Sequence, residues 1–325
     1  MKILITGCAG FIGFHLCVNL LKDKKNKVFG LDNINKYYDV KLKKIRLNQL
    51  ISSQNFKFYK INICNKRILS ENFKKNNYNI VVHLAAQAGI RYSLKNPDTY
   101  IRNNIVGFHN VINYSQRNKV KHFIFASSSS VYGENNKFPL KEIYKTDHPL
   151  SIYAATKKSN EVSAYSFSNL YKIPVTGLRF FTVYGPFGRP DMAIYSFVES
   201  ILNNRKIFLF NKGNNYRDFT YIDDAINCVK KIIYKPPRSK IPFVIYNIGS
   251  DHTVKTSKLL NIISKNLKIK PKIKYVESVR GDVIKTHANI DEIYKKISYK
   301  PKVSIELGIK NFIEWYKSQI FSFKK

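Results

Sequence analysis

The sequence predicts an α/β protein with a doubly wound parallel sheet, followed by a smaller mixed α/β region. Three observations predict this class. Apolar runs alternate with helical patterns through the first half of the chain, a glycine-rich turn follows the first run, and the alternation loosens after about residue 180. Strands that alternate with helices pair in parallel and are covered on both faces. The short spacings fit right-handed crossovers between neighbouring strands.

The first half contains six expected strands, placed where apolar residues run continuously or alternate. They are Lys2–Thr6, Val28–Asp32, Phe56–Ile61, Ile80–Ala85, His122–Ser128 and Val175–Phe181. Helical periodicity predicts helices between them near residues 11–22, 66–76, 97–118 and 151–171.

The second half begins with a loop marked by Gly185, Pro186, Gly188 and Pro190. Strands are then expected at 207–210, 244–249 and 272–276, with helices near 191–204, 223–234, 256–267 and 304–318. We therefore expect a first domain at 1–180 and a second at 181–325. Some segments of about 217–250 are expected to return to the first domain.

The charge is unusual for a chain of this composition. The 325 residues include 56 Lys and Arg against 21 Asp and Glu, a net charge of +35, while 44% are hydrophobic. This content permits a large core, and the positive charge first suggests nucleic acid or an anionic membrane as partner. The excess is spread evenly without a tail or block, so compositional drift explains it better, and we expect neither partner.

Four cysteines without metal-ligand spacing predict neither a disulfide framework nor a metal site, and favour the cytoplasm. The first strand begins at Lys2, so we expect no signal peptide. No apolar run reaches the roughly 18 residues of a membrane span.

The run GCAGFIG places Gly7, Gly10 and Gly13 between the first strand and the first helix. Glycine permits the tight turn and close approach of the backbone to a pyrophosphate, and the helix N-terminus offers amides to the phosphates. Asp32 ends the second strand, where a carboxylate binds ribose hydroxyls and repels a 2′-phosphate. The pattern favours NAD. Lys36 and Lys41 leave NADP open, and a nucleotide-free domain is the weaker alternative.

Tyr153 and Lys157 stand four residues apart at the start of a predicted helix, so they share one face. A neighbouring ammonium lowers the pKa of a tyrosine and makes it a usable base. The run ASSSSVYG ends a strand at the same sheet edge, where Ser128, or its neighbours Ser127 and Ser129, can bind a substrate oxygen. Taken alone, Tyr153 and Lys157 can also be two ordinary residues of an amphipathic helix, and the serine run can be an ordinary turn at the end of a strand.

Long runs of the chain resemble extended short-chain dehydrogenases/reductases of the NAD-dependent epimerase/dehydratase family, and most closely UDP-glucuronate 4-epimerases. The resemblance extends from Lys2 to about Tyr316. The runs are GLDNINKYYDV (30–40), HLAAQAGIRYS (83–93), ASSSSVYG (126–133), YAATKKSNE (153–161), LRFFTVYGPFGRPDMA (178–193) and RDFTYIDD (217–224).

The resemblance implies a Rossmann fold and inversion at C4 of a UDP-sugar through a 4-keto intermediate. Tyr153 would be the proton acceptor and Lys157 would hold the nicotinamide ribose. The implied cofactor-binding residues are Gly7, Gly10, Phe11, Ile12, Gly13, Asp32, Asn33, Asn62, Ile63, Leu84, Ala85, Ala86, Gln87, Asn104, Tyr153 and Lys157. The implied substrate-binding residues are Ser128, Ser129, Thr182, Arg189, Arg217 and, from a spacing one residue short of the family pattern, Arg280. Asn62 replaces the usual aspartate.

The resemblance also separates sister reactions. Ser129 and Ser130 stand where 4,6-dehydratases carry an Asp–Glu pair, and Ser130 stands where decarboxylases carry Glu. Thr182 replaces the Asn usual in UDP-glucose epimerases. These differences favour UDP-glucuronate. An epimerase of UDP-glucose or UDP-N-acetylhexosamine and a non-catalytic Rossmann protein with a basic binding surface remain alternatives. The resemblance also implies a homodimer formed through residues 97–118 and 151–171.

Overall fold

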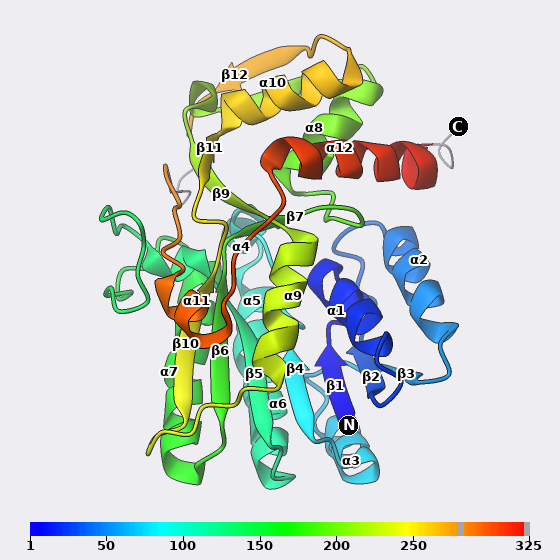
Figure 1. Ribbon diagram of the computed structural model, residues 1–325, viewed down its shortest axis with the longest axis vertical. Helices are drawn as coiled ribbons and strands as arrows, with labels where there is room; N and C mark the ends of the chain where they lie inside the picture. The colour runs from blue at the N-terminus through cyan, green and yellow to red at the C-terminus, as the bar shows by residue number, and fades with distance from the viewer. Residues whose placement is uncertain (279–282, 322–325) are drawn as a thin grey trace.

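A seven-stranded parallel sheet forms the centre of a computed structural model that describes residues 1–278 and 283–321 (Figure 1). Its order is β10-β6-β5-β4-β1-β2-β3. The strands are β1 (Lys2–Thr6), β2 (Lys27–Asp32), β3 (Phe56–Lys60), β4 (Ile80–His83), β5 (His122–Ser128), β6 (Val175–Phe180) and β10 (Phe243–Ile248). The chain winds outward in both directions from β1 and β4, so the predicted fold class is confirmed.

Two apolar cores cover the two faces of this sheet, because side chains alternate along each strand. On β1, Ile3 and Ile5 belong to one core and Leu4 to the other. The first core includes residues of α1 (Phe11–Leu21) and α9 (Ile222–Ile233). The second lies under α3 (Lys66–Asn76), α6 (Gly107–Arg117) and α7 (Ile152–Tyr171).

The predicted helix at 97–118 is a continuous run of three helical segments. These are α5 (Pro97–Tyr100), the π-helical segment η1 (Ile101–Val106) and α6. Two helices in the first half of the chain were absent from the sequence prediction: α2 (Val40–Ile51), beside α1 in Figure 1, and α4 (Ile90–Lys95), which precedes α5. In the second half, α11 (Asp291–Ile297) was also absent from it. The short 3₁₀ helix η2 (Ser129–Tyr132) follows β5.

The smaller region lies beyond the carboxyl ends of the sheet strands, at the top of Figure 1. A three-stranded sheet joins β11 (Thr253–Lys255), β9 (Tyr216–Tyr221) and β7 (Thr182–Tyr184), and β8 (Ile207–Phe210) pairs in parallel with β12 (Ile273–Val276). Its helices are α8 (Ala193–Leu202), α10 (Thr256–Leu267) and α12 (Ile305–Tyr316), whereas α11 (Asp291–Ile297) packs against β10 and α9 (Ile222–Ile233).

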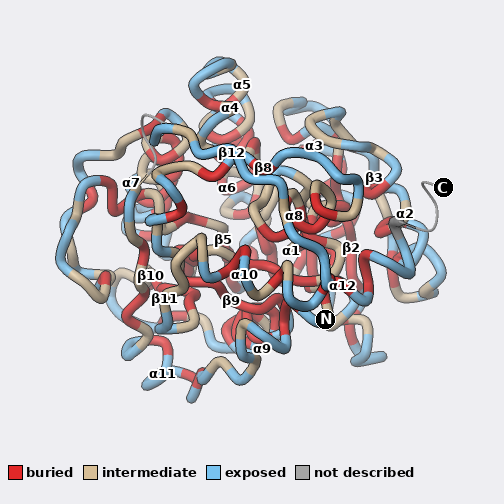
Figure 2. Tube along the Cα trace, turned by 90° about the horizontal axis from the view of Figure 1, so that it is seen from above, coloured by how far each residue is buried: buried red, intermediate tan, exposed pale blue. Residues whose placement is uncertain are grey.

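Two segments from the second half of the chain return to the central sheet. β10 forms its edge next to β6, and α9 packs against α1 in the first core. Figure 2 looks down on the molecule and shows buried residues gathered around α1, α9 and β9. None of the helices within residues 1–278 and 283–321 has the length and apolar character that crossing a membrane requires. The four cysteines are free, and Cys8, Cys17 and Cys228 are buried.

Candidate active site

The glycine-rich loop, residues 7–13, connects β1 to α1, and two of its positions require glycine. Gly7 has φ of 75°, and a Cβ there would lie 2.8 Å from the Ala85 nitrogen. A Cβ on Gly13 would lie 2.2 Å from the Gly7 carbonyl oxygen. Gly10 is the N-cap of α1 and carries no capping side chain, so the first-turn amides are open to a ligand. The loop is a backbone cradle suited to an anion.

The next two residues also contribute to this end of α1. Phe11 is buried and lines a cavity beneath the smaller region, and Ile12 packs against the first core. Both side chains hold the helix start against the sheet, which fixes the position of the amides in the cradle.

Asp32 ends β2 beside the glycine-rich loop. Its Oδ2 accepts from the Ala9 amide at 3.1 Å and its Oδ1 from the Ile34 amide at 2.8 Å. Burial raises the pKa of Asp32, whereas these amides and the cations Lys43 and Arg46 oppose the rise. Asn33 follows and is half-buried, and its Oδ1 accepts from the Asn35 amide at 3.2 Å. The carboxylate is therefore fixed at the sheet edge, next to the cradle.

The segment Leu84–Gln87 lines the other side of the cradle. The Leu84 amide donates to the Thr6 carbonyl at 3.1 Å, and the Ala85 amide donates to Thr6 Oγ1 at 3.2 Å. Ala86 continues the segment. Asn104 on η1 fastens its end, since its Oδ1 accepts from the Gln87 amide at 2.8 Å and its Nδ2 donates to the Gln87 carbonyl at 3.0 Å.

Asn62 and Ile63 follow β3 and lie at the far end of the same sheet edge. Asn62 is exposed, and its Oδ1 accepts from the Cys64 amide at 2.9 Å. Ile63 is buried, and its carbonyl accepts from Asn110 Nδ2 at 3.0 Å. The Asn62 oxygen thus shapes its own turn, and its amide nitrogen is the group left to face a ligand.

Tyr153 and Lys157 lie one turn apart on α7, which begins where Ser151 caps it by accepting from the Ala154 amide at 3.2 Å. Lys157 is buried, and its Nζ donates to the Ala126 carbonyl on β5 at 2.7 Å. Burial lowers the pKa of Lys157 to about 8, and the charge of Glu161 opposes this change. Lys157 thereby ties the helix that carries the phenol to the strand that carries the serines.

The pKa of Tyr153 shifts in the direction opposite to the sequence prediction. Burial raises it, while a hydrogen bond with Ser128 and the charge of Arg189 oppose the rise. The Lys157 ammonium is bound to a backbone carbonyl, so it does not offset the burial of the phenol. The chain alone therefore holds Tyr153 as a neutral phenol, and a further positive charge is needed to favour the phenolate.

The three candidate serines have different surroundings. Ser127 is buried and donates to Glu161 Oε1 at 2.5 Å, so its hydroxyl is used inside the protein. Ser128 lies at the end of β5, where its Oγ accepts from the Ser130 amide at 3.2 Å and donates to Ser130 Oγ at 3.2 Å. It lies close enough to Tyr153 to oppose the rise in the pKa of that phenol. Ser129 begins η2 and is half-buried. The structure brings Ser128, not Ser127, to the phenol.

Arg189 lies near the same phenol and is paired with Asp191. Its Nε donates to Asp191 Oδ1 at 3.0 Å and its Nη2 to Oδ2 at 2.5 Å. Tyr37 also donates to Asp191 Oδ2, at 3.1 Å. The carboxylate raises the pKa of Arg189, against the opposing effect of burial, so the guanidinium is permanently charged. Asp191 and Tyr37 are site residues that the sequence reasoning missed, although Asp191 stands within the quoted run 178–193.

Thr182 begins β7 and, with Arg189, lines a small cavity between the glycine-rich loop and the smaller region. Phe11, Met192, Tyr195 and Phe312 line other parts of this cavity. The lining thus combines a hydroxyl and a guanidinium with apolar side chains.

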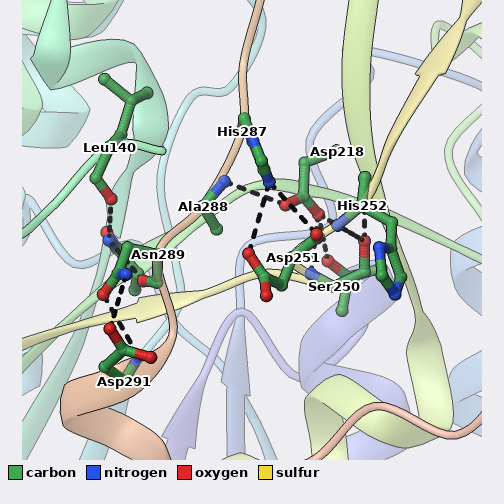
Figure 3. Close-up of polar contacts among 11 residues, drawn as sticks. Leu140, Asp218, Ser250, Asp251, His252, His287, Ala288, Asn289 and Asp291 are labelled. Atoms are coloured by element: carbon green, nitrogen blue, oxygen red, sulfur yellow. Dashed lines mark hydrogen bonds and ion pairs between the residues drawn. The ribbon is translucent and has the colours of Figure 1, made fainter. Parts of the chain in front are cut away.

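Arg217 lies on β9, and its Nη1 donates to the carbonyls of Tyr216 at 3.0 Å and Ile284 at 3.1 Å. The next residue, Asp218, is fully buried and fastens this strand to two distant segments (Figure 3). Asp218 accepts from the Ser250 amide at 2.7 Å and the Ala288 amide at 3.0 Å. Arg280 lies outside the described residues.

A buried ion pair behind the serines was also missed. Glu161, on α7 one turn after Lys157, accepts from Arg179 Nε and Nη2, both at 2.9 Å. Both side chains are 3% exposed. The signal was available, because Glu161 repeats the four-residue spacing from Tyr153 to Lys157. The pair ties α7 to β6 and, through Ser127, to β5.

The site thus joins a glycine-rich backbone loop, the Asp32 carboxylate at the end of β2, and a half-buried phenol close to the Ser128 hydroxyl. A family model described as NAD dependent epimerase/dehydratase family matches residues 3–249. This chain belongs to the NAD dependent epimerase/dehydratase family.

Relatives in the epimerase/dehydratase family match nearly the whole chain. Protein CapI of Staphylococcus aureus is 45% identical over 97% of this chain and 98% of its own length. UDP-glucuronate 4-epimerase 5 of Arabidopsis thaliana is 43% identical over 97% of this chain and 75% of its own length. The solved structure of a UDP-glucuronic acid 4-epimerase from Bacillus cereus, in complex with UDP-glucuronic acid and NAD, has a TM-score of 0.91 at 33% identity. It covers 98% of this chain and 99% of that one.

Proposed function

We propose that this chain is an NAD-dependent 4-epimerase that interconverts UDP-glucuronate and UDP-galacturonate. One observation carries the proposal: the Tyr153 phenol lies close to the Ser128 hydroxyl and to the permanently charged Arg189, near a backbone loop suited to a dinucleotide. The UDP-glucuronate 4-epimerases among its relatives support the same activity.

The residues present fit NAD. The loop that would bind the pyrophosphate can fold this tightly only because Gly7 and Gly13 lack a Cβ, which would meet the backbone of Ala85 and Gly7. Asp32 offers a carboxylate to the ribose hydroxyls and disfavours a 2′-phosphate. Leu84–Gln87 and Asn104 line the next stretch, and Lys157 is placed to bind the nicotinamide ribose. NAD⁺ supplies the hydride acceptor for C4 and a positive ring that favours the phenolate of Tyr153.

The residues of the chain then move one proton and hold the sugar. Tyr153 takes the proton from the C4 hydroxyl as the C4–H bond breaks, and Ser128 hydrogen-bonds the resulting carbonyl oxygen. The 4-keto sugar turns in the pocket, and Tyr153 returns the proton when C4 is reduced from the opposite face. Lys157 keeps α7 fixed against β5 throughout.

Thr182, Arg189 and Ser129 form the proposed site for the C6 carboxylate, and Arg217 the site for the diphosphate. A guanidinium binds either anion through paired donors. Binding of the C6 carboxylate is needed because the 4-keto intermediate is a β-keto acid, which tends to lose carbon dioxide. Holding the carboxylate keeps the C5–C6 bond out of line with the carbonyl π-system, so carbon dioxide is retained.

Replacing Arg189 with Met is expected to raise KM for UDP-glucuronate roughly 10- to 100-fold, which corresponds to the loss of a charged hydrogen bond. Steady-state kinetics checks this. The change also leaves the Asp191 carboxylate without its cation near Tyr153. The double variant Arg189→Met/Asp191→Asn removes that charge as well, so it is the control, and it should keep the raised KM. An unchanged KM in the double variant would remove Arg189 from the carboxylate site.

An epimerase of UDP-glucose remains the second candidate, since a UDP-glucose 4-epimerase from Thermotoga maritima matches with a TM-score of 0.88 at 29% identity. Thr182 and the charged Arg189 favour the acidic sugar. The test compares kcat/KM for UDP-glucuronate and UDP-glucose on the purified NAD-loaded protein. We expect UDP-glucuronate to exceed UDP-glucose by about 100-fold or more, because the neutral sugar offers no carboxylate to the Arg189 guanidinium. Equal values would favour the second candidate.

The positive surface is proposed to assist capture of the substrate. The net charge of +35 creates a positive field around the protein, and this field attracts a UDP-sugar that carries about three negative charges. We expect kcat/KM to fall several-fold between about 0.02 and 0.3 M salt, since the Debye length shortens over this range. Kinetics in an inert salt measures the effect. A flat response would leave the excess charge as compositional drift, and tight, salt-sensitive RNA binding without epimerisation would instead support the non-catalytic alternative.

We also propose a cytoplasmic homodimer, with residues 1–180 and the returning segments around 217–250 as the NAD-binding domain. The helices at 97–118 and 151–171 carry exposed apolar side chains, namely Ile101, Val106, Val162, Tyr165 and Leu170. Two such helix pairs related by a two-fold axis would form a four-helix contact. Four free cysteines suit a reducing compartment. Sedimentation of the protein and of Val162→Asp tests the dimer, and a wild-type monomer would contradict it.

A further inference from the structure

Arg46 is a buried cation whose bonds all go to neutral groups. It lies on the inner face of α2 and is 0% exposed. Its Nη1 donates to the Ala9 carbonyl at 2.9 Å and to the Tyr38 hydroxyl at 2.7 Å, and its Nε has no partner in the part of the chain that the structure describes. Burying a charge is costly unless its donors are satisfied, so this arrangement calls for a reason beyond packing.

The other half of the guanidinium reaches a different loop. Nη2 donates to the Phe187 carbonyl at 2.7 Å and to the Gly188 carbonyl at 3.2 Å. These residues immediately precede Arg189. One planar group therefore spans two loops that are far apart in the sequence: the glycine-rich loop, residues 7–13, and the 185–191 loop.

The two loops belong to different ligands. The glycine-rich loop is the proposed cradle for NAD, and the 185–191 loop carries the guanidinium proposed for the sugar carboxylate. Arg46 is also close enough to Asp32 for its charge to oppose the pKa rise of that carboxyl group. The single buried side chain is thus in contact with one loop of each site.

We propose that Arg46 is a positioning residue that couples the two sites, so that NAD and the UDP-sugar each strengthen the binding of the other. The inference rests on the proposed function. The guanidinium is rigid, and its two nitrogens hold the carbonyls of the two loops at fixed separations. Ordering of one loop by its ligand then orders the other, and by linkage the coupling acts equally in both directions.

A second contact holds the 185–191 loop without reaching the glycine-rich loop carbonyls. His15 on α1 donates from Nε2 to the Pro186 carbonyl at 2.8 Å, and burial lowers the pKa of His15 to about 4, so it is neutral. Its ring lies among Phe11, Phe14 and Phe187. His15→Phe removes this hydrogen bond but keeps an aromatic ring, and it is therefore a matched control.

The test measures loss of bound NAD from Tyr153→Phe protein, which we expect to bind UDP-glucuronate without turning it over. The rate is followed in the presence of a glycohydrolase that destroys released NAD, with and without saturating UDP-glucuronate. We expect UDP-glucuronate to slow NAD loss about fivefold or more. Adding Arg46→Met or Arg46→Lys should reduce this ratio to below about twofold, because neither side chain can bridge both loops. Adding His15→Phe should leave the ratio unchanged.

Thermal melting of each variant accompanies these rates, and Arg46→Lys decides the outcome if Arg46→Met does not fold. A merely structural Arg46 would lower Tm and leave the ratio as in the parent, which would overturn the proposal. Binding of UDP-glucuronate to the parent without any slowing of NAD loss would overturn it as well. Calorimetry separates failure of the coupling proposal from failure of the proposed function. If UDP-glucuronate does not bind the NAD-loaded parent at all, the coupling proposal and the proposed function are both wrong.

Discussion

Tyr153→Phe is expected to reduce kcat by about 10³-fold or more while NAD stays bound. The change removes one oxygen, the atom to which the proposed mechanism assigns the C4 proton, so the expected loss corresponds to that of a general base. Conversion of UDP-glucuronate, followed by chromatography, measures kcat. Absorbance of the nucleotide released on denaturation measures NAD content.

Ser127→Ala is the control for Tyr153→Phe. It removes a hydroxyl from the same run, but this hydroxyl is bound to Glu161 rather than to the phenol. We expect its kcat to change by less than about tenfold, because this hydroxyl bonds to a carboxylate away from the phenol and takes no part in the proton transfer. A near-normal kcat for Tyr153→Phe would refute the role given to the phenol. A comparable loss in Ser127→Ala would show that structural damage, not proton transfer, causes the effect.

Glu161→Gln is expected to lower the free energy of unfolding by roughly 3–5 kcal/mol, since it leaves Arg179 charged and unpaired in the interior. The Arg179 guanidinium also donates to the Glu142 carbonyl at 3.1 Å and lies 4.7 Å from the Tyr132 ring centre. The charge of Arg179 opposes the rise in the pKa of the nearby Glu142 carboxyl group, but that group accepts from the Asn247 amide at 2.8 Å rather than from Arg179. Urea unfolding of the protein measures the change.

The exposed pair Lys295–Glu292, at 3.0 Å, provides the matched comparison. Glu292→Gln should cost less than about 1 kcal/mol, as surface pairs do. The double variant Glu161→Leu/Arg179→Leu should recover much of the stability lost in Glu161→Gln, because no buried charge remains unpaired. Equal costs at the buried and exposed pairs would contradict the account of how α7 is fixed to the sheet.

The sheet could be predicted from the sequence because its strands are apolar on both faces. β1 and β5 begin and end at the predicted residues, as does α3. The glycine-rich loop was predictable for the same reason that glycine is required there: the Gly7 and Gly13 positions leave no room for a Cβ.

The helix α2 was missed because its buried face is not apolar. Lys43 and Arg46 lie inward beside Leu42, Leu47 and Leu50, so the apolar period is broken by two cations. For the same reason, the sequence did not indicate that Arg46 is buried and bound to loop carbonyls. The charges of a lysine-rich helix can face either solvent or loop carbonyls. Tertiary contacts decide between the two, and the periodicity of the sequence gives no information about these contacts.

The pKa of Tyr153 also depends on three-dimensional contacts. The spacing of Tyr153 and Lys157 predicts that both residues lie on one face of a helix, as they do in the structure. It does not predict which group the Lys157 ammonium binds. A carbonyl from another element, Ala126 on β5, holds it. The pairing of Arg189 with Asp191 and Tyr37 joins loops more than 150 residues apart, so only the folded chain reveals it.

The central claim is that the hydrogen removed from C4 returns to C4 within one active site. Incubating the purified protein with UDP-glucuronate deuterated at C4, without added NAD or reductant, tests this by nuclear magnetic resonance. We expect UDP-galacturonate with the deuterium retained at C4 and no carbon dioxide. Replacement of the label by solvent hydrogen, or a UDP-pentose as the main product, would contradict the account.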